Sequence, residues 1–148
     1  MSDKIEKTVL LAAPMDRVWR ALTDHREFGS WFGVELEAPF EVGAIARGRI
    51  THKGYEHVVW QAVIKAIDPP DYFAFSWHPY AIDPKIDYSG EKPTLVEFRL
   101  EPVDGSTRLT VVESGFSALP EYRQPDALRM NGKGWEIQME NIKAHVER

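Results

Sequence analysis

Residues 124–146 read QPDALRMNGKGWEIQMENIKAHV, and their apolar positions recur at intervals of 7, 4, 3 and 4 residues. Such intervals are typical of an α-helix with one apolar face. That face consists of Leu128, Trp135, Met139, Ile142 and Val146. Gln124-Pro125-Asp126 suits the first turn, because the N–H that proline lacks would be unpaired there. Gly132 and Gly134 each cost about 1 kcal/mol of helix propensity, which predicts a close approach to another backbone or a bend.

The segments before this helix alternate between apolar and polar residues, as β-strands do. The predicted strands are residues 34–38, 44–52, 55–67, 72–78, 94–102 and 107–114. Asp68-Pro69-Pro70-Asp71 predicts a turn, because proline cannot join a β-ladder, and Asp104-Gly105 predicts a tight hairpin. Residues 79–93 hold three prolines and a glycine without any period, so we expect a long loop of the kind that is often functional.

A strand and two short helices are predicted at the N-terminus. Residues 4–12 alternate as a strand does, and Ala13-Pro14 suits the opening of a helix. Asp24 and Glu27 have the spacing of an N-cap and its reciprocal partner, which predicts a second helix through Trp31. Because the later strands follow one another without intervening helices, the fold class is α+β with an antiparallel sheet and helices on one side.

The composition predicts a single soluble domain over residues 1–148, with 43% apolar and 28% charged residues. The chain has no cysteine, which excludes disulfides and thiolate chemistry. A net charge of −5 argues against nucleic-acid binding, because that binding needs a basic face. The charged N-terminal segment and the absence of an apolar run of about 20 residues predict a cytoplasmic protein without a membrane span.

Large apolar side chains from separate elements are the main indication of a binding site. Each one alone is more often part of the core, but flat rings facing a concave sheet rarely fill the space completely. We therefore expect at least two of the set to line a cavity, with Trp135 and Met139 best placed to touch a ligand. The candidate ligand-binding residues are Trp31, Trp60, Phe75, Trp77, Phe98, Trp135 and Met139.

Two polar residues are candidates for acid–base catalysis. Glu113 shares strand parity with Leu109 and Val111, so it projects toward the apolar face unless it reaches solvent or an arginine. His52 shares parity with Ile50 but adjoins a turn, where exposure to solvent is the simpler interpretation. The five histidines include no pair at i, i+4 spacing and no phosphate-binding loop is present, so we predict neither a metal nor a cofactor.

Four motifs, in the same order along the chain, resemble a known family. They are Ala13-Pro14 with Val18-Trp19 and Trp31, Ile67-Asp68-Pro69-Pro70 before Phe75-Ser76-Trp77, Thr107-Arg108-Leu109-Thr110 before Glu113-Ser114-Gly115-Phe116, and Gly134-Trp135. They resemble the START-like superfamily with its helix-grip fold, and within it the activator of heat-shock protein 90 ATPase homologue family. The resemblance implies a curved antiparallel sheet wrapped around the C-terminal helix, a cavity between them, and a link to the stress response.

The first functional hypothesis is a non-enzymatic binding domain for a small hydrophobic or amphipathic molecule, entered near residues 79–93 and the C-terminal helix. Because the same fold supports cyclase- and hydrolase-like enzymes, an enzyme that uses Glu113 or His52 is the alternative. A third hypothesis is an interaction module that acts on a chaperone. Exposed edge strands leave both a monomer and a homodimer open.

Overall fold

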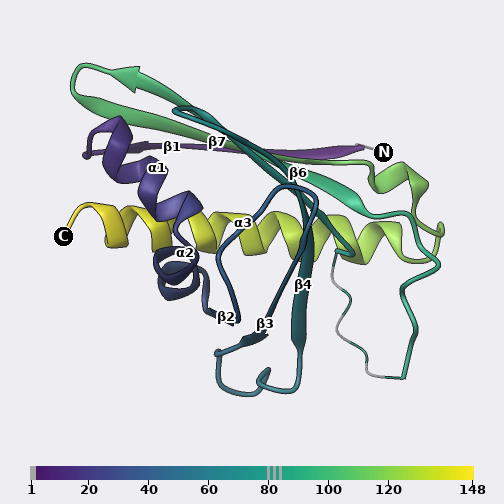
Figure 1. The fold of residues 1–148 in the computed structure, drawn as a ribbon. Helices are drawn as coiled ribbons and strands as arrows, with labels where there is room; N and C mark the ends of the chain where they lie inside the picture. Colours follow the sequence, from purple (N-terminus) through teal and green to yellow (C-terminus); the bar gives the residue numbers. More distant parts are fainter. Residues whose placement is uncertain (1–2, 80, 82, 84) are drawn as a thin grey trace.

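The structure is a computed structural model that describes residues 3–79, 81, 83 and 85–148. Its long C-terminal helix, α3 (Gln124–Val146), has the predicted bounds, with Pro125 in the first turn. Figure 1 shows α3 as one continuous helix lying along the sheet. Its buried side chains are Ala127, Trp135, Met139, Ile142 and Val146. The predicted apolar face is therefore confirmed, except that Leu128 is only partly buried.

Seven strands form one antiparallel sheet in the order β1-β7-β6-β5-β4-β3-β2. The strands are β1 (Lys4–Leu11), β2 (Val34–Leu36), β3 (Ile45–Ile50), β4 (Val59–Asp68), β5 (Tyr72–Trp77), β6 (Thr94–Val103) and β7 (Ser106–Ser114). Between β1 and β2 lie α1 (Met15–Thr23) and α2 (His25–Phe32), and a short 3-10 helix, η1 (Phe116–Ala118), precedes α3. The predicted fold class is confirmed, with two short helices after the first strand and the long helix packed on the sheet.

The predicted turns are present, but several strands are shorter than predicted, and the largest difference is at the start of β4. Positive φ angles of 49° at Asp104 and 82° at Gly105 form the hairpin between β6 and β7. β4 begins at Val59 and not at Tyr55. The backbone N–H of Tyr55 donates to His52, and that of Val58 to Tyr55, so turns replace the first residues of the predicted strand.

The glycines of α3 do not meet another backbone, so the prediction of a close approach is wrong. A Cβ atom built on Gly132 or Gly134 would have no atom within 4 Å. Close approaches occur at other glycines instead. A Cβ atom on Gly29 would lie 2.2 Å from the carbonyl oxygen of Val34, and one on Gly48 would lie 2.4 Å from that of Glu35.

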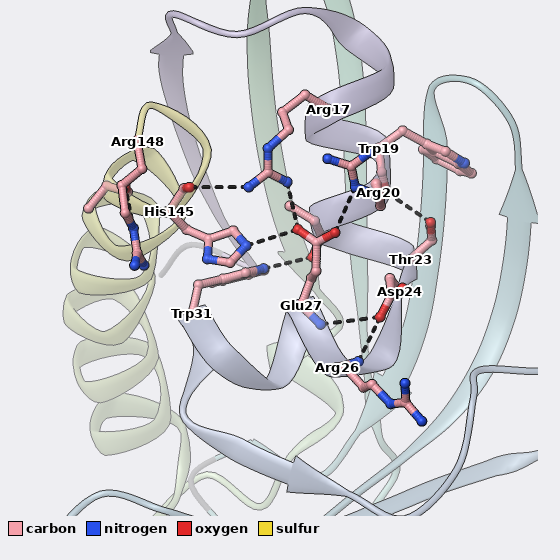
Figure 2. Close-up of polar contacts among 12 residues, drawn as sticks. Arg17, Trp19, Arg20, Thr23, Asp24, Arg26, Glu27, Trp31, His145 and Arg148 are labelled. Atoms are coloured by element: carbon pink, nitrogen blue, oxygen red, sulfur yellow. Dashed lines mark hydrogen bonds and ion pairs between the residues drawn. The ribbon is translucent and has the colours of Figure 1, made fainter.

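The start of α2 is capped as predicted, though not reciprocally. Oδ1 of Asp24 accepts hydrogen bonds from the backbone N–H groups of Arg26 and Glu27. The Glu27 carboxylate does not return to Asp24, whose own N–H donates to the Arg20 carbonyl oxygen. It binds Arg17, Arg20 and His145 instead, because charge-assisted hydrogen bonds from the two arginines outcompete a single backbone N–H (Figure 2).

β4 and β5 are paired along only part of their length, and their separation positions the candidate site. The ladder runs from Asp68 opposite Tyr72 to Val63 opposite Ser76. Residues 59–62 of β4 still pair with β3, but within the described chain they have no ladder partner in β5. The first half of β4 therefore diverges from β5 and leaves an open sheet edge on that side.

Candidate ligand-binding cavity

A cavity of about 700 Å³ lies where β4 and β5 separate, beneath the middle of α3. The helix contributes Met130, Asn131, Gly134, Trp135, Ile137 and Gln138 to its lining. Residues 58–63 line it along the open edge of β4. Residues of the loop between β5 and β6, including Ala81, Ser89 and Pro93, complete the wall. The loop and the C-terminal helix, which the sequence predicted as the place of an entrance, thus both contribute to the lining of this cavity.

Aromatic rings make up much of the cavity wall. Trp77 of β5 and Trp135 of α3 are nearly parallel, with ring centroids 5.7 Å apart and planes inclined by 29°. Trp60 of β4 meets Trp77 at 6.0 Å and 76°. Phe32, at the end of α2, contacts all three tryptophans. Four different elements, α2, β4, β5 and α3, thus bring their rings to one place.

The mouth of the cavity is apolar and open to water. Tyr55, Val59 and Ile137 line it and are 46%, 61% and 54% exposed. Exposed large apolar side chains that gather at a cavity are typical of a binding surface. Gly134 lies beside them on α3, one turn before Gln138, and its missing side chain leaves this part of the cavity open.

Glu113, near the end of β7, lies directly behind the cavity wall and is completely buried. Its Oε2 accepts hydrogen bonds from Nε1 of Trp77 at 2.7 Å and from Oγ1 of Thr94 at 2.6 Å. Its Oε1 accepts from Nε1 of Trp135 at 2.8 Å and from Nδ2 of Asn131 at 2.9 Å. Both oxygens are therefore occupied, and the carboxylate holds the side chains of β5, β6 and α3 in place.

Two buried nitrogen atoms at the cavity have no hydrogen-bond partner among the described residues. They are Nε1 of Trp60 and Nδ1 of His78. Trp60 is only 6% exposed, so its N–H group has lost water without gaining an acceptor. A buried donor without an acceptor is costly, and a bound molecule or water can supply the missing atom.

An ion pair fastens the loop beside the cavity to the start of α3. Arg123 contacts the Glu91 carboxylate at 2.7 Å, and both side chains are almost completely buried. The Arg123 guanidinium also donates to the carbonyl oxygen of Pro79 and lies 4.6 Å from the ring centre of Tyr88. One arginine thus joins both ends of the loop to the helix.

The structure distributes the candidate residues over three environments. Trp60, Trp77 and Trp135 line the cavity, whereas Phe75, Phe98 and Met139 lie in the adjoining core. Trp31 is buried elsewhere, with its indole N–H bonded to the carbonyl oxygen of Ala21 (Figure 2).

The two catalytic candidates do not face the cavity. Glu113 is enclosed by its four donors, and His52 is exposed in the loop before β4, where its ring contacts Tyr55. Sequence reasoning missed Asn131, although it lies four residues before Trp135, which is the spacing that puts two side chains on one helix face. It also missed Gln138, which lies three residues after Trp135 and carries the same signal, and Phe32, for which no pattern in the sequence gives a signal.

A second polar cluster lies away from the cavity, where α1, α2 and the end of α3 meet. Figure 2 shows the Glu27 carboxylate between Arg17, Arg20 and His145. Burial raises the pKa of Glu27, but hydrogen bonds from His145, Arg17 and Arg20 outweigh it and hold the pKa at about 2. This cluster joins three helices, so its role is structural.

Metal binding and membrane insertion find no support in the described residues. They contain no group of three or more His, Asp or Glu side chains arranged to hold a metal ion. In the part of the chain that the structure describes, no helix is long and apolar enough to cross a membrane.

The sheet that curves around a C-terminal helix, with a cavity between them, defines a helix-grip protein of the START-like type. The profile of the family described as activator of Hsp90 ATPase homolog 1-like protein matches residues 12–147. The chain belongs to this family.

Solved structures share this fold at low sequence identity. MLL2253 from Mesorhizobium loti is 21% identical, with a TM-score of 0.76, and the match covers 98% of this chain and 97% of MLL2253. The Aha1 dimer from Colwellia psychrerythraea is 15% identical with a TM-score of 0.73, over 99% and 97%. DynU16, from the dynemicin biosynthetic locus, is 24% identical with a TM-score of 0.75 over 99% of this chain. The present chain spans only 48% of DynU16. A search of curated proteins found no significant match.

Proposed function

We propose that this protein is a non-enzymatic binding domain that holds one small hydrophobic or amphipathic molecule in the cavity between β4, β5 and α3. The observation that carries the proposal is the cavity itself. Its volume of about 700 Å³ lies within the range of about 300–1,000 Å³ that is usual for small-molecule sites. Aromatic walls and an apolar mouth suit a ligand whose body is apolar.

The polar groups of the cavity favour a ligand that also carries a hydrogen-bonding group. Nε1 of Trp60 and Nδ1 of His78 are buried without partners among the described residues. The open edge of β4 adds backbone groups that β5 does not pair. A small number of polar groups in an otherwise apolar cavity orients a ligand and gives specificity.

The placement of the candidate acid–base groups supports binding over catalysis. A general acid or base must come within hydrogen-bond reach of the reacting group. Both oxygens of Glu113 are already occupied by Trp77, Thr94, Asn131 and Trp135, and His52 lies in an exposed loop. The enzymatic alternative would therefore have to recruit a different residue.

Native mass spectrometry of the freshly purified protein, followed by organic extraction, tests the proposal. We expect one equivalent of a small apolar or amphipathic molecule, and addition of the same compound to emptied protein should raise the melting temperature. A Gly134→Leu variant, whose side chain enters the cavity, should carry less of the molecule, and Gly132→Leu, whose position does not line the cavity, serves as the matched control. If the protein copurifies with no such molecule, and if no compound of this kind raises its melting temperature, the proposal is contradicted.

A second candidate function is activation of an Hsp90-type ATPase, which the family description favours. The measurement is the ATPase rate of Hsp90 from the same organism with increasing amounts of this protein. Stimulation that saturates would support this role, and an unchanged rate at a large excess would exclude it.

A further inference from the structure

The negatively charged Glu113 carboxylate is separated from the cavity by a single layer of side chains. Glu113 itself is completely buried and does not line the cavity. Three of its four hydrogen-bond donors, Trp77, Asn131 and Trp135, do line it. The charge therefore lies directly behind the wall that a ligand would touch.

The described residues give this carboxylate only neutral partners. Two indole groups, an amide and a hydroxyl donate to it, and no lysine, arginine or histidine is among its partners. Neutral donors solvate a buried charge but do not cancel it, and a buried charge without an opposite charge is unfavourable. In a site of low dielectric constant the field of the carboxylate reaches into the cavity.

The described part of the cavity wall carries no permanently charged side chain. Among the described lining residues there is no lysine, arginine, aspartate or glutamate. Its rings meet at different angles: Trp60 and Trp77 at 76°, Phe32 and Trp135 at 62°, and Trp77 and Trp135 at only 29°. The face of a tryptophan ring that borders a cavity attracts an ammonium group.

An anionic ligand would find the opposite conditions. It would be repelled by Glu113, and the N–H groups of Trp77 and Trp135 are already committed to that carboxylate. A neutral apolar ligand would gain from the rings but would leave the charge uncompensated. Only a cation gains from both the rings and the carboxylate.

We infer that the cavity selects an amphipathic cation, with a quaternary or protonated ammonium group against Trp77 and Trp135, in front of Glu113. The apolar body of the ligand would contact Val59 and Ile137 at the mouth. This inference rests on the proposed function and specifies, in addition, that the ligand is positively charged.

Three probes of similar size test the inference: phenyltrimethylammonium, its neutral isostere tert-butylbenzene, and benzenesulfonate. Binding is followed through the indole N–H signals in ¹⁵N–¹H correlation spectra at pH 8, where histidine side chains ordinarily carry no charge. We expect the cation to shift the signals of Trp60, Trp77 and Trp135, and to leave those of Trp19 and Trp31, which do not line the cavity. It should bind about tenfold more tightly than tert-butylbenzene, and benzenesulfonate should bind least.

A matched pair of variants separates the buried charge from the net charge of the protein. Glu113→Gln and Glu140→Gln each remove one negative charge, but Glu140 is exposed on α3. Glu113→Gln should weaken phenyltrimethylammonium binding by about fivefold more than it weakens tert-butylbenzene binding, because both probes depend on the shape of the cavity but only the cation depends on the charge. Glu140→Gln should change neither.

The outcomes distinguish this inference from the function on which it rests. If tert-butylbenzene binds the cavity as tightly as the cation, the selection for positive charge is overturned, while the binding function stands. If no probe shifts the three cavity signals, the proposed function fails together with the inference. If Glu113→Gln does not fold, the comparison of the three probes on the unmodified protein still decides between these outcomes.

Discussion

The indole N–H of Trp135 on α3 donates a hydrogen bond of 2.8 Å to Oε1 of Glu113 on β7. This contact joins the long helix to the sheet at the base of the cavity. The same carboxylate accepts from Trp77 at 2.7 Å, so two of the rings that line the cavity are oriented by one buried group. The shape of the cavity therefore depends on a residue that does not line it.

Glu113→Gln should lower the free energy of unfolding by about 2–4 kcal/mol, because hydrogen bonds to a charged group are lost and buried donors are left unpaired. The four donors now share the two oxygen atoms of the carboxylate, whereas a glutamine side chain has only one acceptor oxygen. Urea unfolding followed by tryptophan fluorescence measures the change, with Glu140→Gln as the control. A loss below about 0.5 kcal/mol, the usual range of surface substitutions, would contradict the assigned role.

Gly132→Ala and Gly134→Ala should each stabilise the protein by about 0.5–1 kcal/mol, because alanine is the better helix former and the added methyl group meets no atom.

Larger side chains at the two positions should have different effects on ligand binding. Gly134 lines the cavity and Gly132 does not, so Gly134→Leu should weaken binding of a cavity ligand while Gly132→Leu should not. Thermal unfolding and ligand titration measure the two effects. Equal loss of binding at both positions would argue against the cavity as the site.

The fold was predictable because its signals are periodic and local. The apolar positions of α3 recur with the helical period, and Asp104-Gly105 specifies a hairpin through positive φ angles. The bounds of β4 were less predictable, because residues 55–58 have strand-like composition but form turns. Local pattern does not reveal where turn hydrogen bonds replace a ladder.

The candidate site was only partly predictable, because it depends on tertiary contacts. Parity placed Glu113 on the inner face, but nothing in the sequence indicates that two tryptophans, an asparagine and a threonine would converge on it. The separation of β4 from β5, which creates the cavity, is likewise a property of the whole sheet. The role of the α3 glycines was not predictable for the same reason. An open cavity and a close backbone approach both favour glycine, so the residue type alone does not distinguish them.

Glu91→Gln should loosen the loop between β5 and β6, because it removes the negative charge that pairs with Arg123 in a buried position. Removing one partner of a buried ion pair costs up to about 3–5 kcal/mol, and the cost is smaller here because Arg123 keeps its contacts with Pro79 and Tyr88. Limited trypsin digestion reports on the loop, since Lys85 is exposed in it and Lys92 is followed by proline. We expect faster cleavage after Lys85, and no such cleavage in a Glu91→Gln/Lys85→Gln double variant. An unchanged rate would show that the ion pair does not hold the loop.

The Glu27 cluster should make stability depend on pH in the acidic range. The folded-state pKa of Glu27 is about 2 against an ordinary value of 4.5, so folding favours the ionised carboxylate. Its contribution is therefore complete above about pH 4.5 and is lost as the pH falls toward 2. Since the side chain is 23% exposed and solvent screens the charges, we expect about 1–2 kcal/mol. Urea unfolding of the wild type and Glu27→Gln at pH 7, 5 and 3.5 should show a difference that shrinks with acidification. A difference that stays constant over this range would mean that packing of the side chain, and not its charge, joins α1, α2 and α3.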